Sequence, residues 1–174
     1  MIFSIKDSVF CAFSLTAHNG ATMRYWLMKS EPDGFGIDDL RNRPLQTEHW
    51  DGVRNYQARN MMRDDMKIGD QVFFYHSNCD KPGIVGIAQV VRESYPDFTA
   101  FDPDDKHFDP KSQTDKPTWF MVDVRFVKKL SRIISLKELK LRTELGDLAL
   151  LRRGNRLSIM PVSEQQWHFI LGME

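Results

Sequence analysis

The stretch Gln71-Val-Phe-Phe-Tyr-His76 decides the fold, because its four central residues are all apolar or aromatic. A short strand with apolar side chains on both faces is typical of the centre of a sheet. Residues 78–83 follow as a polar run that ends in Pro-Gly, which predicts a turn. A second strand is predicted over residues 84–91, where Gly86 indicates a bulge or a close approach of another backbone.

Three further strands are predicted on either side of this centre. Residues 25–29 are aromatic and aliphatic, and residues 157–162 supply a late strand. Residues 120–129 alternate between two sets, which indicates a half-buried strand: Val122, Val124 and Phe126 against Met121, Asp123 and Arg125.

Short helices are predicted between these strands. Residues 37–43 form one or two helical turns before Pro44. Ser135 and Ser163 each stand three residues before a Glu or Gln, so a capping box should start a helix at both. A helical spacing of three and four residues links Ala58, Met61, Met62 and Met66. The pattern predicts an α+β fold: a small, curved, mixed β-barrel of five to six strands with short flanking helices.

The length of 174 residues suits one domain that needs no disulfide or metal for stability. Two cysteines exclude a disulfide framework and a four-thiolate zinc site, and no apolar run is long enough to cross a membrane. The 24 basic residues balance 24 acidic ones, which excludes a protein that coats nucleic acid non-specifically.

The first residues stand apart from this pattern. Lys6-Asp7-Ser8 interrupts a mildly apolar stretch, which does not fit the unbroken apolar core of a signal peptide. Every recognisable strand begins at Met23 or later. We therefore expect residues 1–22 to be an N-terminal extension outside the fold, and residues 23–174 to form the domain.

A long irregular segment, residues 93–118, is rich in proline and acidic residues. Such a segment inside a compact domain is usually functional or disordered. The next stretch, residues 119–156, is rich in basic residues. Its arginines suit phosphate binding, and a solvated surface is the other interpretation that the sequence leaves open.

Enzymatic motifs are missing from the sequence. It contains no glycine-rich phosphate loop, no His-Glu-x-x-His and no Gly-x-Ser-x-Gly, and its five histidines lack metal-ligand spacing. We therefore expect no catalytic residue, no metal site and no cofactor.

Three tryptophans suggest a binding site instead. Trp26, Trp50 and Trp119 are predicted at a strand, a turn and a strand start, each beside polar residues. A buried tryptophan usually belongs to the core. Aromatic walls with a few hydrogen-bonding groups also form pockets for flat heterocycles such as bases.

Five segments of the sequence resemble the EVE domain: Tyr25-Trp-Leu-Met-Lys-Ser-Glu-Pro32, Trp50-Asp-Gly-Val-Arg-Asn-Tyr-Gln-Ala-Arg-Asn60, Phe73-Phe-Tyr-His-Ser-Asn78, Gly83-Ile-Val-Gly86 and Arg156-Leu-Ser-Ile-Met-Pro-Val162. The likeness runs from Met23 to the C terminus. It implies a PUA-like β-barrel related to the YTH readers of methylated adenine. It also implies recognition of a modified base in DNA or RNA, not its processing.

The resemblance also implies the site residues. Trp50 matches the first cage tryptophan of YTH domains, and Trp119 is the nearest candidate for a second. The expected modified-base pocket comprises Trp26, Lys29, Ser30, Glu31, Trp50, Asp51, Arg54, Asn55, Tyr75, His76, Ser77, Asn78, Trp119 and Ser158. The basic composition of residues 119–156, and not the resemblance, makes Arg152, Arg153 and Arg156 the expected phosphate-binding residues.

The expected function is therefore a non-catalytic module that binds a modified base of DNA or RNA in an aromatic cage. The alternative is an accessory or enzymatic component of a nucleic-acid modification or restriction system, because PUA-like domains also serve in such systems. The expected partner is modified nucleic acid and not a membrane, and a monomer is favoured. Such a module belongs in the cytoplasm of a bacterium or the nucleus of a eukaryote.

Overall fold

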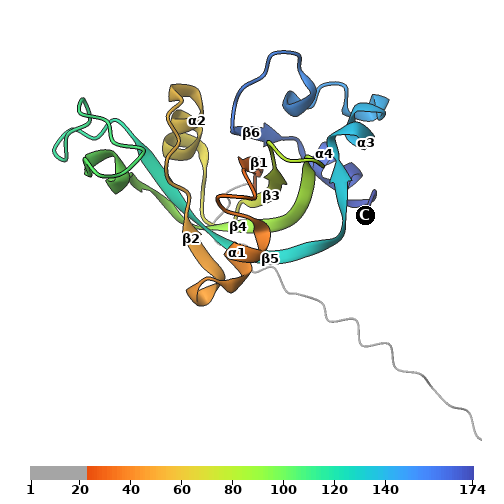
Figure 1. Ribbon diagram of the computed structural model, residues 1–174. Coiled ribbons are helices and arrows are strands. Elements are labelled where there is room, and N and C mark those ends of the chain that lie inside the picture. Colours follow the sequence, from red (N-terminus) through yellow and green to blue (C-terminus); the bar gives the residue numbers. More distant parts are fainter. Residues whose placement is uncertain (1–22) are drawn as a thin grey trace, which may run out of the picture.

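The computed structural model describes residues 23–174, and the expected extension, residues 1–22, lies outside the described residues. The described chain forms one six-stranded sheet with short helices around it (Figure 1). The strands are β1 (Tyr25–Ser30), β2 (Thr47–His49), β3 (Gln71–His76), β4 (Gly83–Pro96), β5 (Phe120–Ser135) and β6 (Ile159–Val162). The helices are α1 (Ile37–Asn42), α2 (Tyr56–Asn60), α3 (Leu136–Lys140) and α4 (Glu164–Leu171).

Several single helical turns complete the fold. A π-helical turn, Met61–Asp65, continues α2, and Met66 follows it. The 3-10 turns are Pro44–Gln46, Phe98–Phe101, Thr143–Leu145 and Ala149–Leu151. Within residues 23–174, no helix is long and apolar enough to cross a membrane.

The strand order is β2-β5-β4-β3-β1-β6, which confirms the interior position predicted for β3. This strand runs parallel to β1 and antiparallel to β4. Alternate residues of β3 enter different hydrophobic clusters: Val72 and Phe74 the first, Phe73 and Tyr75 the second. The strand is therefore buried on both sides, as its composition indicates.

The predicted α+β class and strand number are confirmed, but the sheet does not form the predicted barrel, because β2 and β6 stand at its two ends and do not pair with each other. Both edge strands are short, with three and four residues. Pro161 in β6 has no N–H to offer a further strand. The sheet stays open, and β4 and β5 bend strongly instead (Figure 1).

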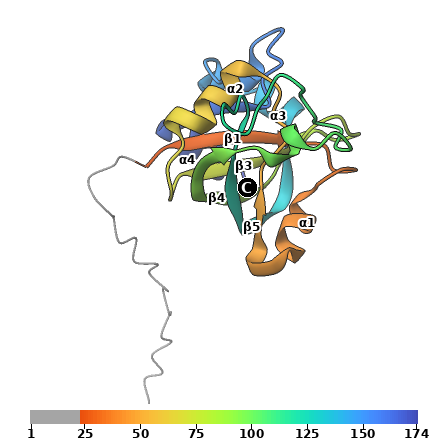
Figure 2. The same ribbon diagram turned by 90° about the vertical axis from the view of Figure 1, so that its left-hand side faces the viewer.

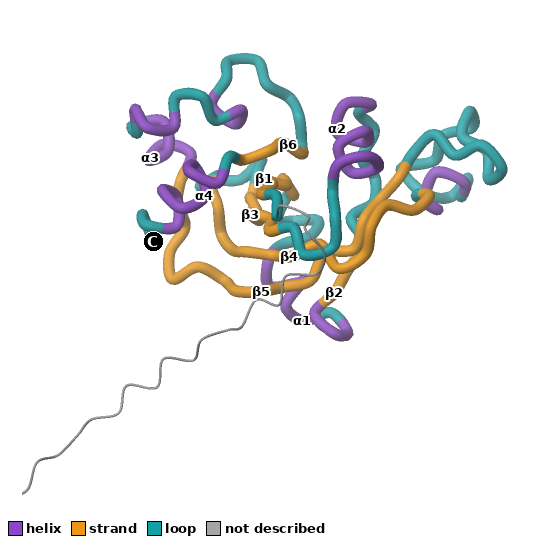
Figure 3. The backbone as a smooth tube through the Cα atoms, turned by 180° about the vertical axis from the view of Figure 1, so that it is seen from behind, coloured by secondary structure: helices purple, strands orange, loops and turns teal. Residues whose placement is uncertain are grey.

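The two longest strands, β4 and β5, span the molecule. Residues 97–118 connect them at one end, whereas α3 follows β5 at the other (Figure 3). A register shift between Phe74 and Tyr75 bulges the β3–β4 pairing next to Gly86. A Cβ atom on Gly86 would lie 2.7 Å from the Ile37 side chain and 2.8 Å from the Lys128 carbonyl oxygen. The predicted bulge and close approach are both present.

The predicted helix starts are confirmed by both capping boxes. The Ser135 hydroxyl accepts from the Glu138 N–H at 3.2 Å, and the Glu138 carboxylate accepts from the Ser135 N–H at 2.9 Å. Ser163 and Gln166 make the same reciprocal pair at the start of α4.

Two hydrophobic clusters flank the central strands. The first contains buried residues of α1 and α2 and the Trp50 ring; the second contains buried residues of α3 and α4. Figure 2 shows β1 and β3 between α2 above and α1 below. The first cluster is the one that borders the candidate site.

Candidate functional site

A cavity of about 530 Å³ opens where β1 and β2 end. Four segments form it: the end of β1 with the following turn, residues 48–52, Arg43 and the loop 105–107. Its lining residues are Lys29, Ser30, Glu31, Gly34, Phe35, Arg43, Glu48, His49, Trp50, Asp51, Gly52, Asp105, Lys106 and His107. The cavity thus brings together five of the residues predicted for a base pocket: Lys29, Ser30, Glu31, Trp50 and Asp51.

Trp50 forms an aromatic wall of the cavity together with Phe35. The two rings meet edge to face, with centroids 6.5 Å apart and planes at 82°. Phe74 supports the indole from the core at 5.3 Å, also edge to face. The backbone N–H of Trp50 donates to the Val122 carbonyl at 2.8 Å, so β5 fixes the backbone of this wall. The residue is only 7% exposed.

A chain of charged groups forms the rim beside Trp50. The Glu48 carboxylate lies 2.5 Å from Arg43 Nε and 2.8 Å from His49 Nδ1. His49 Nε2 lies 3.7 Å from the Asp51 carboxylate. Glu48 already pairs with Arg43 and His49, whereas Asp51 has, among the described residues, only the more distant contact with His49. Of these two carboxylates, Asp51 therefore has more of its oxygen lone pairs available to accept hydrogen bonds.

The end of β1 and the turn after it supply another part of the rim. The Lys29 N–H donates to the Ser158 carbonyl at 2.8 Å, and burial lowers the pKa of the Lys29 ammonium. The Ser30 hydroxyl donates to the Phe35 carbonyl at 2.6 Å, which closes the turn that carries Phe35.

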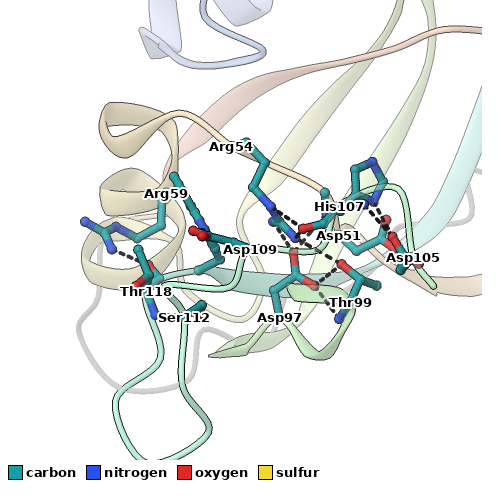
Figure 4. Close-up of polar contacts among 12 residues, drawn as sticks. Asp51, Arg54, Arg59, Asp97, Thr99, Asp105, His107, Asp109, Ser112 and Thr118 are labelled. Carbon is teal, nitrogen blue, oxygen red and sulfur yellow. Dashed lines mark hydrogen bonds and ion pairs between the residues drawn. The ribbon is translucent and has the colours of Figure 1, made fainter. Parts of the chain in front are cut away.

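The loop 105–107, which belongs to the segment 97–118, forms a further wall of the cavity. Polar contacts anchor this segment to the rest of the fold. Arg54 lies between Asp97 and the backbone of His107 (Figure 4). The His107 ring packs on Gly52, whose φ of 70° favours glycine. Arg54, predicted to line the pocket, instead lies behind this wall.

The other two predicted tryptophans lie away from the cavity. Trp26 is buried in the core, and its indole N–H donates to the Asp70 carboxylate at 2.8 Å. Trp119 stacks on Tyr56 with ring centroids 5.0 Å apart, and its indole N–H donates to Asp109 at 2.7 Å. The structure therefore does not assemble the three tryptophans into one cage.

Most of the remaining predicted residues have structural contacts outside the cavity. Asn55 caps α2 by accepting from the Ala58 N–H at 3.0 Å. His76 Nε2 accepts from the Ile37 N–H at 3.1 Å. Tyr75 is buried in the second cluster, where burial, more than the nearby Cys79, raises its pKa to about 12.

Three smaller residues complete this set. The Ser77 N–H donates to the Ser30 carbonyl at 2.8 Å, and Asn78 turns the chain at a φ of 50°. Ser158 meets the site through its backbone carbonyl, which accepts from Lys29.

Two of the three predicted phosphate-binding arginines line a separate groove. Arg152 and Arg153 line a hollow of about 690 Å³ together with Gln57 and Asn155. Arg156 is exposed but does not line this groove.

Much of the cavity wall comes from residues without a recognisable sequence pattern. Phe35, Arg43, Glu48 and His49 carried no motif, and β2 was not predicted. The only signal for the loop 105–107 was the acidic excess of the long segment that contains it. Within residues 23–174, no group of three or more His, Cys, Asp or Glu residues could hold a metal ion.

Comparisons with known proteins agree on one family. Thymocyte nuclear protein 1 of Rattus norvegicus is 48% identical over 167 residues, which cover 86% of this chain and 73% of the relative. The crystal structure of human THYN1 protein in complex with 5-methylcytosine containing DNA is 46% identical, with a TM-score of 0.82 over 86% of this chain and 96% of that chain.

A more distant structure shows the wider fold relationship. The YTH domain of Zygosaccharomyces rouxii MRB1 protein, solved in complex with N6-methyladenosine RNA, has a TM-score of 0.51 over 90% of this chain and 87% of that chain. At 13% identity this likeness shows a shared fold alone. The model of the EVE domain matches residues 24–173, nearly all of the described chain. The chain therefore belongs to the EVE domain family.

Proposed function

We propose that this protein binds a modified base of DNA in the cavity beside Trp50 and does no chemistry on it. The observation that carries the proposal is the union, in one cavity, of the Trp50 and Phe35 rings with the hydrogen-bonding groups of Lys29 and Asp51. A base has two apolar faces and a polar edge, so it needs this combination. A volume of about 530 Å³ falls within the usual range for small-ligand pockets.

The charges around the cavity favour a base with an exocyclic amino group. Glu31 and Asp51 present carboxylates, which accept hydrogen bonds and repel groups that only accept. The amino group of cytosine is a donor that such carboxylates recognise. The related human THYN1 protein was solved with 5-methylcytosine containing DNA, which supports a modified cytosine as the base for this chain.

Contact with the nucleic-acid backbone is assigned to the arginines outside the cavity. Arg152 and Arg153 line a groove of their own, and Arg156 is exposed near them in the sequence. Phosphate contacts position a duplex or strand without reading its bases. In this proposal the cavity beside Trp50 binds the base, and the groove with Arg152 and Arg153 binds phosphates. The protein would act in the nucleus of a eukaryote or the cytoplasm of a bacterium.

A binding screen tests this function. Oligonucleotides that differ only in one base, cytosine or a modified cytosine, are titrated against the full chain, in DNA and in RNA versions. We expect tighter binding of the modified DNA and intact oligonucleotide after prolonged incubation. Equal affinities for every base contradict base recognition, and conversion or cleavage of the oligonucleotide contradicts the non-catalytic assignment.

A further inference from the structure

We propose that Arg54 is a positioning residue, which holds the loop 105–107 against the cavity and thereby sets its discrimination between bases. This inference rests on the proposed function of the cavity. Arg54 itself does not line the cavity, whereas Asp105, Lys106 and His107 do.

The Arg54 guanidinium connects two parts of the segment 97–118 that lie apart in the sequence (Figure 4). Its Nη1 donates to the Asp97 carboxylate at 2.7 Å, and its Nε donates to the His107 carbonyl at 2.9 Å. Its Nη2 reaches the Thr99 hydroxyl at 3.2 Å and also the His107 carbonyl. A planar guanidinium offers several donors in fixed directions, so one side chain can hold all three partners.

Asp97 is the buried partner that fixes Arg54 in place. It is fully buried and accepts hydrogen bonds from Arg54, from the Gly52 N–H at 3.0 Å and from Thr99. Burial by itself would raise the pKa of Asp97, but these hydrogen bonds outweigh it and lower the pKa below its usual value. Asp97 is therefore ionised at neutral pH, and it ties the Trp50–Gly52 turn to the start of the segment.

The contacts between His107 and Asp105 lie within the loop itself, where the His107 N–H donates to the Asp105 carboxylate at 2.7 Å. His107 Nδ1 is buried and lies 3.3 Å from Asp105, and no described residue hydrogen-bonds to that atom. The ring is held by packing on Gly52, where an added Cβ would lie 2.4 Å from His107 Cε1. Its place at the cavity therefore depends on the backbone carbonyl that Arg54 binds.

A second anchor at the far end of the segment provides a matched control. Arg59 donates to the Thr118 carbonyl, and the Thr118 N–H donates to the Ser112 hydroxyl at 3.0 Å. None of these three residues lines the cavity. Arg54 and Arg59 thus hold the same segment, but only Arg54 holds the part that forms a cavity wall.

The test compares Arg54→Lys with Arg59→Lys in the full chain. Lysine keeps the positive charge but lacks the planar guanidinium, whose separate nitrogens bond Asp97, Thr99 and His107 at the same time. For Arg54→Lys, we expect the preference for modified over unmodified DNA to fall roughly tenfold, the size of one lost hydrogen bond. We also expect faster amide hydrogen exchange at residues 105–108. Arg59→Lys should leave both quantities as they are in the parent protein.

Two results would overturn the inference. One is unchanged exchange at residues 105–108 in Arg54→Lys, which shows that the loop does not depend on Arg54. The other is an equal loss of preference in both variants, which indicates general loosening. If the parent protein itself shows no preference, the proposed function fails, and the exchange measurement alone decides whether Arg54 positions the loop.

A second variant changes the same wall while leaving the Arg54 and Asp97 side chains in place. Gly52→Ala pushes the His107 ring away directly, because the added methyl group overlaps it. We expect the same loss of preference as in Arg54→Lys. Retained preference in Gly52→Ala contradicts a role for the His107 wall.

Discussion

Trp50 and Trp167 are buried to nearly the same extent, at 7% and 4% exposure, yet they occupy different kinds of site. Trp167 stacks face to face on Phe73 at 3.8 Å and on Tyr25 at 4.8 Å, inside the second cluster. Trp50 meets its aromatic neighbours only edge to face, and polar groups line the cavity beside it. Burial alone therefore does not distinguish the two residues, whereas the orientation of the neighbouring rings and the cavity beside Trp50 do.

The largest effect is expected from Trp167→Ala. Loss of a stacked, fully packed indole should lower the free energy of unfolding by about 3–5 kcal/mol. Denaturant titration measures this loss, and Trp167→Phe is the control that keeps a stacking ring. The ratio of affinities for modified and unmodified DNA should not change, and a change would break the contrast with Trp50.

Trp50→Ala should lower stability and base affinity together, because its ring belongs to the first cluster and to the cavity wall. The affinity loss expected for one stacking face is about 1–3 kcal/mol, or roughly tenfold to a hundredfold. Trp50→Phe separates the two effects, since a smaller ring still offers a face to a base. If Trp50→Ala keeps the preference for modified DNA while folded, the ring is a core residue like Trp167.

The groove lined by Arg152 and Arg153 extends the comparison to a region that we propose contacts phosphates and not bases. Reversal of charge at Arg152 and Arg153 should weaken binding to modified and unmodified DNA alike. Each lost phosphate contact should reduce the salt dependence of log K by roughly 0.9. The matched control reverses Lys137 and Lys140, which lie at a different surface hollow. An unchanged salt dependence would show that Arg152 and Arg153 do not contact phosphates and belong to the ordinary solvated surface.

The smallest effect is expected from deletion of residues 1–22. Among the described residues, both clusters begin at Tyr25 or Trp26, and the EVE domain match begins at residue 24. Melting temperature and affinity should therefore stay as in the full chain. A loss of several degrees would show that the deleted residues contribute to one of the two clusters.

Part of the cavity was predictable because its residues lie in short, continuous motifs. Lys29 and Ser30 end β1 and Glu31 follows it, whereas Trp50 and Asp51 follow β2, so each group is placed by the end of one strand. The same reasoning failed for Trp26 and Trp119, which also stand beside polar residues. In the folded structure, the indole N–H of Trp26 donates to Asp70 and that of Trp119 donates to Asp109, and both hydrogen bonds lie away from the cavity.

By itself, the sequence determined the features that depend on a few neighbouring residues. The apolar run of β3, the capping boxes at Ser135 and Ser163 and the close approach at Gly86 follow from local periodicity, side-chain chemistry and the lack of a side chain. Only the tertiary structure decided that the sheet stays open and that the loop 105–107 completes the cavity. Arg54 and His107 stand far apart in the sequence, and the contact between them forms only when the bent strands β4 and β5 carry the segment 97–118 back to the Trp50 turn. Local pattern cannot encode such a contact, because its geometry depends on the packing of the whole sheet.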